Sequence, residues 1–365
     1  MQEVYWFVEF YSIINRGGFD VIIGNPPYVE NKEVKQYEIK GYSCESAGNL
    51  YALVIERCFS LESQLTYQGY IVPVSSISTD RYKPLQKILL SHESHISSFD
   101  DRPSRLFEGL EHIRLTIHII GKPSKTPKVF STRYNKWSAS ERDILFNCLR
   151  YAKTEISFLE GTVPKFSSEI EFNISAKLSQ KSRLERFYNK SSSERIFYSR
   201  KVGYFLQVLD FEPKVLDGQG NRRPPSEFKE LSFSTRSQAK IALCCLNSNL
   251  FYWFITVCSD CRHVNKREVD SLPVDLSNLA AEKDGSNLVK LAQKLMQDID
   301  ENSEERKMRF KHDTLSIQCI FPVKSKPIID EIDRILAQHY GFTEEELDFI
   351  INYDIKYRMG RDSES

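Results

Sequence analysis

Four consecutive residues, Asn25-Pro26-Pro27-Tyr28, hold the groups of this chain that are best suited to chemistry. The Asn25 side-chain oxygen and the Pro26 carbonyl oxygen accept hydrogen bonds, and neither proline has an N–H to compete. Two acceptors aimed at one point suit an –NH2 group, and the Tyr28 ring offers a flat face to the planar ring that carries it. If both N–H hydrogens are accepted, the nitrogen lone pair localises. The amine can then attack an electrophilic methyl group without a covalent enzyme intermediate.

The residues before this turn predict where it lies. Val21-Ile22-Ile23 is a short apolar strand that enters the turn through Gly24. Open α/β sheets bind ligands outside the carboxyl ends of their strands, so the strand puts the turn at a ligand-binding edge. A proline-rich turn without function is the alternative for the four residues alone. The apolar strand, with Asp20 ahead of it, favours a functional turn.

Residues 1–127 alternate between predicted strands and helices, which implies a parallel sheet with helices on its faces. The apolar runs predict strands at 21–23, 70–74, 95–99 and 114–120. Apolar residues at helical spacing predict a helix over 49–65, and a second over 84–90 has proline in its first turn. The segment 122–128, KPSKTPK, is a predicted linker.

The rest of the chain is predicted to be mixed and then helical. A capping box at Ser138 and Glu141 predicts a helix to residue 153, and a second box lies at Thr343 and Glu346. The remaining predictions are short strands at 196–198 and 204–208, a loop at 217–226, an apolar helix at 239–258, and helices from Ser286 onward. The predicted domains are therefore 1–127, 128–280 and 281–365.

Composition is ordinary for a soluble globular protein: of 365 residues, 41% are hydrophobic and 27% are charged, with no net charge. The longest apolar run, 250–258, is far short of a membrane span. Charged residues interrupt the first twenty positions, which argues against a signal peptide. We therefore expect a cytoplasmic protein whose eight cysteines are reduced thiols.

Charge is distributed unevenly. Between Lys177 and Lys240 there are 14 Lys and Arg residues against 7 Asp and Glu, and the end of the chain is acidic. A basic middle suits phosphates, and chance clustering on a solvated surface is the alternative. The residues that we predict to contact DNA are Arg200, Lys201, Arg262, Asn265, Lys266 and Arg267.

A metal site is the less favoured interpretation of Cys258, Cys261 and His263. Their spacing is that of metal ligands, but a closed site needs a fourth ligand, and the sequence names no clear one. We expect no metal.

The segment FDVIIGNPPY resembles motif IV of the S-adenosylmethionine-dependent amino-methyltransferases, specifically the N6-adenine DNA methyltransferases. Asn49-Leu50-Tyr51 is similar to motif V of that family, 69–76 to motif VI, and the segment around Phe107 to motif VIII. The segments 197–205 and 247–269 resemble the target-recognition region of large restriction-modification and phage-exclusion adenine methylases. The closing segment 339–360 resembles the C-terminal end of that group.

This resemblance implies an α/β fold class: the C-terminal half of a Rossmann-like class I methyltransferase sheet, a mixed α/β target-recognition domain and a helical tail. It implies site-specific adenine-N6 methylation of double-stranded DNA within a restriction-modification or phage-defence system. The target adenine would be flipped out of the duplex. Asn25 and the Pro26 carbonyl would hold N6, while Tyr28 and Phe107 would stack on the base.

The resemblance also implies S-adenosylmethionine, bound by a glycine-rich loop that precedes motif IV. Only Gly17 and Gly18 lie ahead of that motif here. We therefore expect the rest of the cofactor site to come from a missing N-terminal half, in cis or in trans, and the isolated chain to bind no S-adenosylmethionine. The strand at 21–23 would then be an uncovered edge, prone to pair with another chain.

Two other functions stay open. The chain could be a non-catalytic DNA-recognition fragment, or a subunit of a split methylase, that keeps the motif as a remnant. Protein methyltransferases that modify glutamine side-chain amides also use NPPY, but they are compact, and the long extension after residue 128 counts against them.

Overall fold

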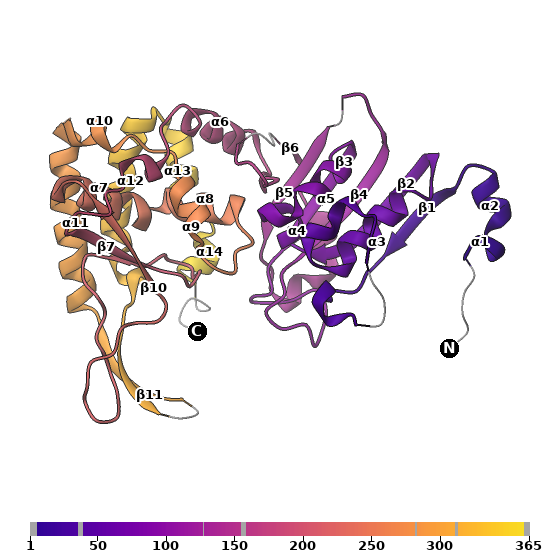
Figure 1. Ribbon diagram of the computed structural model, residues 1–365. Coiled ribbons are helices and arrows are strands. Elements are labelled where there is room, and N and C mark those ends of the chain that lie inside the picture. The colour runs from indigo at the N-terminus through magenta and orange to yellow at the C-terminus, as the bar shows by residue number, and fades with distance from the viewer. Residues whose placement is uncertain are drawn as a thin grey trace. The chain divides into compact units, whose positions relative to one another are not determined.

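The computed structural model describes residues 6–35, 39–126, 128–154, 158–281, 283–310 and 313–360, and it confirms a mixed α/β fold (Figure 1). The chain divides into two compact units. The first comprises residues 1–172 with 257–260, and the second comprises 173–256 with 261–365. The functional division at residues 127 and 280 stays a prediction.

The first unit is built on one six-stranded sheet with the order β1-β2-β4-β3-β5-β6. Its strands are β1 (Phe19–Gly24), β2 (Glu62–Pro73), β3 (His92–Phe99), β4 (Leu115–Pro123), β5 (Val129–Asn135) and β6 (Ala152–Lys153). The helices that accompany it are α1 (Trp6–Glu9), α2 (Tyr11–Asn15), α3 (Leu50–Phe59), α4 (Ser75–Ser78) and α5 (Lys83–Leu89). The four predicted strands and the proline-led helix are confirmed as β1 to β4 and α5.

The prediction of a parallel sheet is wrong. β1 is parallel to β2, and β3 is parallel to β5, but β4 runs antiparallel to both β2 and β3. A parallel return needs a crossover of a dozen or more residues, usually a helix. The segment 100–114 between β3 and β4 contains no helix, so β4 turns back beside β3. Segment 122–128, the predicted linker, joins β4 to β5 of the same sheet, and its residue 127 lies outside the described residues.

Two predicted helices are shorter than the sequence pattern suggests. The helix over 49–65 begins after its N-cap Asn49 but ends at Phe59, and β2 takes over at Glu62 to pair with β1. The capping box of Ser138 and Glu141 forms, yet it opens only two 3-10 turns over 139–148. Sheet pairing of β6 with β5 then takes residues 152–153, which the prediction placed in the helix.

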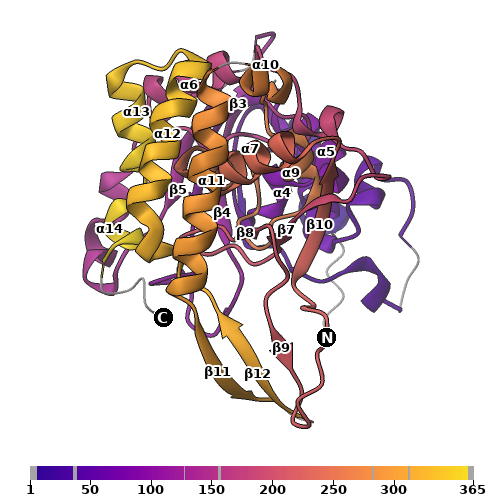
Figure 2. The ribbon, with the colours of Figure 1, turned by 90° about the vertical axis from the view of Figure 1, so that its left-hand side faces the viewer.

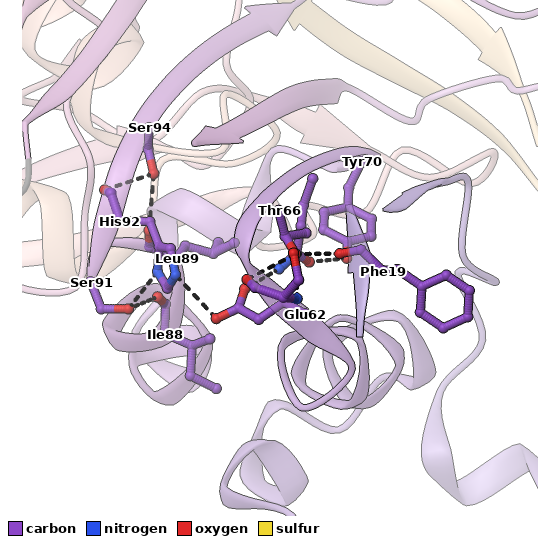
Figure 3. Close-up of polar contacts among 11 residues, drawn as sticks. Phe19, Glu62, Thr66, Tyr70, Ile88, Leu89, Ser91, His92 and Ser94 are labelled. Atoms are coloured by element: carbon purple, nitrogen blue, oxygen red, sulfur yellow. Dashed lines mark hydrogen bonds and ion pairs between the residues drawn. The ribbon is translucent and has the colours of Figure 1, made fainter. Parts of the chain in front are cut away.

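Polar contacts tie the amino end of β1 to the sheet (Figure 3). The Thr66 hydroxyl of β2 donates to the carbonyl oxygen of Phe19. At the start of β2, Oε1 of Glu62 lies 3.3 Å from Nε2 of His92, and Nδ1 of His92 lies 2.8 Å from the Ser91 hydroxyl. Among the described residues β1 pairs with β2 alone, so these contacts help to hold the edge strand in register.

His118 of β4 makes the stability of this unit sensitive to pH. The side chain is fully buried, and its Nε2 lies 3.3 Å from the hydroxyl oxygen of Ser76. Burial lowers the pKa of His118 from 6.5 to about 4, because a buried imidazolium loses its hydration. Between these two pKa values the unfolded chain binds a proton that the folded chain does not bind.

We therefore expect the free energy of unfolding to fall as the pH decreases from about 6.5 towards 4, with a total loss of about 3 kcal/mol. A His118→Gln variant removes this proton, so its stability should depend less on pH in the same window. Urea unfolding of both proteins at neutral and mildly acidic pH measures how their free energies of unfolding depend on pH. Hydrogen exchange in β4 is a second measurement of the same effect. Equal pH dependence in the two proteins would contradict the assignment.

The second unit combines helices with two three-stranded sheets. One sheet has the order β10-β7-β8, formed by β7 (Glu194–Ser199), β8 (Val208–Leu209) and β10 (Phe228–Phe233). Its helices are α7 (Arg236–Asn247), α8 (Asn249–Cys258), α9 (Lys266–Ser271), α10 (Leu276–Ala281), α11 (Lys283–Glu301), α12 (Lys326–Tyr340), α13 (Glu344–Ile351) and α14 (Ile355–Arg358). Helix α6 (Glu169–Leu178) spans the boundary between the units. The strand at 196–198 and the capping box of Thr343 are confirmed, whereas only residue 208 of the strand at 204–208 is extended in a sheet.

The apolar stretch 239–258 forms two helices rather than the one predicted. Ser248 separates α7 from α8. The Asp333 carboxylate accepts from the N–H groups of Asn249 (2.9 Å) and Leu250 (3.1 Å), and so supplies the start of α8 with its hydrogen-bond acceptors. Within the described ranges no single helix is long and apolar enough to cross a membrane. The helix pair α7–α8, which is bent by 62°, meets this criterion when both helices are taken together, by length and composition alone.

The prediction of helices alone from Ser286 onward is wrong. Residues 304–319 form an antiparallel hairpin, β11 (Glu304–Arg309) and β12 (Thr314–Cys319), and β12 pairs further with β9 (Val215–Leu216). We call residues 214–216, 304–309 and 314–319 the β-arm. Figure 2 shows it extending beyond the ends of α11 and α12 within this unit. All six β11 residues are exposed, so no apolar stripe marked this strand in the sequence.

Candidate functional site

The turn Asn25–Tyr28 follows the carboxyl end of β1, as its sequence predicts. The Tyr28 hydroxyl is shared between the Asn25 side-chain oxygen at 2.7 Å and the Ile71 carbonyl oxygen of β2 at 2.8 Å. Pro26 is buried, whereas the Asn25 and Pro27 side chains are exposed. The tyrosine thus links the asparagine to the neighbouring strand and orients its amide, while the oxygen keeps a second lone pair for another donor.

Tyr28 packs at one end of a row of aromatic rings that continues through Tyr51 and Tyr82. Its ring meets Tyr51 of α3 edge to face at 6.2 Å, and Tyr51 stacks on Tyr82 at 5.3 Å. Burial raises the pKa of Tyr28 to about 12, so the phenol stays protonated at neutral pH and its hydroxyl can donate.

Backbone hydrogen bonds fix the chain that leaves the turn. The Leu50 N–H donates to the Val29 carbonyl oxygen at 2.9 Å, and the Asn31 N–H donates to that of Gly48 at 3.0 Å. Gly48 has a φ of 69°, in the left-handed region that favours glycine. The segment that resembles motif V therefore packs beside the one that resembles motif IV.

Phe107 lies in the loop between β3 and β4. Both Phe107 and Tyr28 are partly buried and pack against one apolar cluster, formed by Phe99, Leu106, Leu115, Trp137 and Leu145. A cavity of about 710 Å³ lies beside Phe107 and is lined by Trp137, Arg105 and Arg142, but not by residues 25–28. The fold brings the two aromatic residues to the same cluster, and their joint stacking on one base stays a prediction.

A buried ion-pair cluster closes the loop that carries Phe107. Asp100 and Asp101 begin the loop, and Arg114 ends it. The Arg114 Nη2 lies 3.3 Å from Asp101 Oδ1, and its Nε lies 3.6 Å from Asp100 Oδ1. Burial raises the pKa of Asp100, while the positive charges of Lys136 and Arg114 act in the opposite direction.

In the second unit the fold joins two of the predicted DNA-contacting segments. Lys201 and His263 form an antiparallel bridge, and the Val264 N–H donates to the Arg200 carbonyl oxygen at 2.8 Å. Arg200 and Lys201 thus lie next to the segment that holds Arg262 and Asn265. Their clustering is established here, and their contact with DNA stays a prediction.

The last two residues of this group are engaged locally. The Lys266 Nζ lies 2.5 Å from Asp270 and 5.2 Å from the centre of the Tyr188 ring. The Arg267 Nη2 lies 2.8 Å from the Glu268 carboxylate, which is almost fully buried. Arg262 is exposed and precedes the bridge.

This difference predicts unlike effects for two arginines. Arg262→Gln should weaken binding of duplex DNA several-fold at fixed salt and, because its side chain is exposed, should cost less stability than Arg267→Gln. Arg267→Gln should mainly lower stability, by about 1–3 kcal/mol, because it leaves the Glu268 carboxylate buried without its partner. Gel-shift titrations and thermal melting of both variants separate the two roles. DNA affinity that is unchanged by Arg262→Gln would rule out this loop as a DNA contact.

Residues 1–107 match the family of Eco57I restriction-modification methylases. The chain is 37% identical over 79 residues to the type II restriction enzyme and methyltransferase RM.Eco57I of Escherichia coli, an alignment that covers 20% of this chain and 8% of that protein. It is 32% identical over 91 residues to a putative type II restriction enzyme and methyltransferase of Methanocaldococcus jannaschii, covering 25% of this chain and 8% of that one. The chain thus matches only 8% of the length of either relative.

Among solved structures, the type IIL restriction-modification enzyme MmeI in complex with DNA aligns with 98% of this chain and 59% of its own. The TM-score is 0.48 and the sequence identity 10%. A putative class I S-adenosylmethionine-dependent methyltransferase from Listeria monocytogenes aligns with 36% of this chain and 42% of its own, with a TM-score of 0.25 and 16% identity.

The stretch that matches the restriction-modification methylases includes Asn25–Tyr28 and ends at Phe107. It therefore contains both parts of the predicted target-base pocket. The basic residues at 200–201 and 262–267, and the β-arm, lie outside it.

Sequence reasoning missed three contributors to this site: the Ile71 carbonyl, Tyr51 and Arg114. A backbone carbonyl has no signature in a sequence, and Tyr51 is partnered with Tyr28 only through the packing of α3. Arg114 follows Asp100 and Asp101 by thirteen residues or more, and nothing local connects them.

The Cys258, Cys261 and His263 spacing leads to no metal cluster among the described residues, where no three His, Cys, Asp or Glu side chains gather as a metal site would require. Cys261 is buried, and its thiol donates to the Thr256 carbonyl oxygen at 3.5 Å.

Proposed function

We propose that this chain supplies the target-adenine pocket and the DNA-recognition part of a restriction-modification or phage-defence methyltransferase that methylates N6 of adenine in double-stranded DNA. One observation carries the proposal: Tyr28 orients the Asn25 amide at the carboxyl end of β1, within a stretch that matches restriction-modification methylases. Because the proposed substrate is DNA, we also propose that the protein acts in the cytoplasm.

The chemistry of the turn suits an aromatic amine. Tyr28 occupies one lone pair of the Asn25 oxygen, and the other accepts one N6 hydrogen of adenine. The Pro26 carbonyl accepts the second hydrogen. The N6 lone pair is then no longer delocalised into the ring, so the nitrogen becomes a better nucleophile. Tyr28 and Phe107 hold the flipped base between their rings, and stacking favours the extruded state.

S-adenosylmethionine is the methyl donor that we propose. The residues that the structure describes do not complete a site for it, because the glycine-rich loop that the resemblance implies has no counterpart among them ahead of Asn25–Tyr28. The exposed edge strand carries Val21 and Ile23, which are 61% and 78% exposed. We propose that cofactor-binding strands pair with this edge, in cis or in trans.

The test is DNA methylation in cells without their own methylases. The chain is expressed alone and together with the product of the coding sequence that precedes it, and the DNA is hydrolysed and analysed by mass spectrometry. N6-methyladenine in the second case, lost in an Asn25→Ala variant, is the expected result. N4-methylcytosine instead, or methylated protein without methylated DNA, would overturn the choice of substrate.

A non-catalytic recognition subunit is the second candidate, and the exposed β1 edge favours it. That role predicts DNA binding by the chain with no methylation in any combination tested. DNA binding without any N6-methyladenine in the DNA would therefore support the non-catalytic subunit.

A further inference from the structure

The β-arm has two chemically different faces. Residues directly opposite each other in an antiparallel pair lie on the same face, and neighbours along a strand lie on opposite faces. The register pairs Lys307 with Ser316 and Arg309 with Thr314, and it pairs Arg306 with Ile317 and Met308 with Leu315. One face is thus polar and basic, and the other is largely apolar.

The polar face continues across the third strand. The Gln318 N–H donates to the Lys214 carbonyl oxygen at 2.9 Å, and the Lys214 N–H donates to the Gln318 side chain at 3.1 Å. Lys214 therefore lies opposite Gln318, on the same side as Lys307 and Arg309. We call this side the basic face, and its residues are Lys214, Leu216, Glu305, Lys307, Arg309, Thr314, Ser316 and Gln318.

The positively charged side chains of the two faces differ in whether they have ion-pair or hydrogen-bond partners. On the apolar side, Arg306 binds Glu304 at 2.7 Å and lies 4.9 Å from the centre of the Phe321 ring. On the basic face, Lys214, Lys307 and Arg309 are exposed, and their side chains make no ion pair or hydrogen bond with any described residue. The acid of this face, Glu305, accepts a hydrogen bond from the Ser316 hydroxyl.

Of the neighbouring acids, Asp300 accepts a hydrogen bond from the Gln318 side chain of the basic face at 3.0 Å, and the others pair with arginines. Asp313, next to the hairpin, lies 3.5 Å from Arg223, which also binds Asp217 at 3.2 Å. Glu212 lies 3.8 Å from Arg222. Lys214, Lys307 and Arg309 therefore outnumber the two carboxylates at this face, Glu305 and Asp300, which leaves a local excess of positive charge.

We propose that the basic face of the β-arm binds the phosphate backbone of DNA. The inference rests on the proposed DNA substrate and adds a contact surface apart from the Arg200–Arg267 cluster. Exposed Lys and Arg side chains on a projecting strand pair fit phosphates spaced along a duplex.

The experiment compares the loss of positive charge on the two faces. The 365-residue chain is titrated against a fluorescently labelled duplex by anisotropy at several salt concentrations. The double variant Lys307→Gln with Arg309→Gln should weaken binding at each salt. It should also reduce the slope of log affinity against log salt by about 1.8, or about 0.9 for each lost phosphate contact. Arg306→Gln, which removes one positive charge from the opposite face, should leave both unchanged.

Glu305→Gln gives the opposite sign, because removing the negative charge of the basic face should tighten binding. All four side chains are exposed, so far-UV circular dichroism and melting should not change. If the double variant binds like the parent chain, if Arg306→Gln weakens binding as much per charge, or if the parent chain binds no duplex at low salt, the proposal is wrong. Methyl transfer is not the readout, so a chain that binds DNA but never methylates it would overturn the proposed function and leave this result standing.

Discussion

Replacing Asn25 by alanine should lower methyl transfer to adenine by about 100- to 1,000-fold, the loss typical of removing one preorganised polar contact to a reacting group. The Asn25 oxygen is fixed by the Tyr28 hydroxyl at 2.7 Å, so the contact to N6 costs no reorientation when the base arrives. DNA affinity should stay within about twofold, because most of that affinity comes from phosphate contacts.

The matched variant is Tyr28→Phe, which keeps the ring and removes only the hydroxyl. It frees the Asn25 amide to rotate and leaves the Ile71 carbonyl without this donor. We expect a smaller loss of rate than for Asn25→Ala, with DNA binding retained. Both rates are measured with labelled methyl donor in the combination that methylates DNA. Full activity in Asn25→Ala would remove this residue from the site.

Replacing Arg114 by glutamine should lower the free energy of unfolding of the first unit by about 3–5 kcal/mol, the cost typical of breaking a buried ion pair. Arg114 lies against two carboxylates that are less than a tenth exposed, Asp100 and Asp101. The loss should be largest at neutral pH and shrink in acid, where protonation removes the unpaired charge. Because Asp100 and Arg114 close the loop, Phe107 should also lose its fixed position.

Arg102→Gln is the control for this effect. Arg102 lies 3.9 Å from the Asp101 carboxylate, but its side chain is 55% exposed. The loss of unfolding free energy should therefore be below about 1 kcal/mol. Urea unfolding gives the two free energies, and hydrogen exchange over residues 100–114 reports whether the loop opens. If the two variants lose equal stability, the buried cluster does not hold the loop.

The site could be predicted from the sequence where its parts are contiguous. The apolar strand, the glycine and the two prolines before Tyr28 are a local pattern, and the turn stands at the end of β1 as expected. The order in which the strands pair could not be predicted from that local pattern. β4 lies between β2 and β3 because the β3–β4 loop contains no crossover helix, and an apolar strand reads the same in either direction.

The β-arm shows where periodicity fails. The β11 sequence EERKMR is exposed at every position, so burial leaves no alternation in it, and a polar stretch reads as a solvated helix end. Only its pairing with β12 and β9 makes it a strand. The helix predicted over 139–153 fails for a related reason: a capping box starts a turn, but pairing of β6 with β5 decides how far the helix runs.

The chemical groups of this protein could be predicted from its sequence: the acceptor pair and aromatic ring of Asn25–Tyr28, the basic residues of the middle segment, and the cap that opens α13. The fold then determined that Tyr28 links Asn25 to Ile71, that Arg200 and Lys201 lie beside Val264, and that Arg114 lies against both Asp100 and Asp101. Local patterns are set by the conformational and hydrogen-bonding preferences of neighbours along the chain. Contacts between distant segments depend on which surfaces are buried together, and one sequence leaves that choice open until the chain is folded.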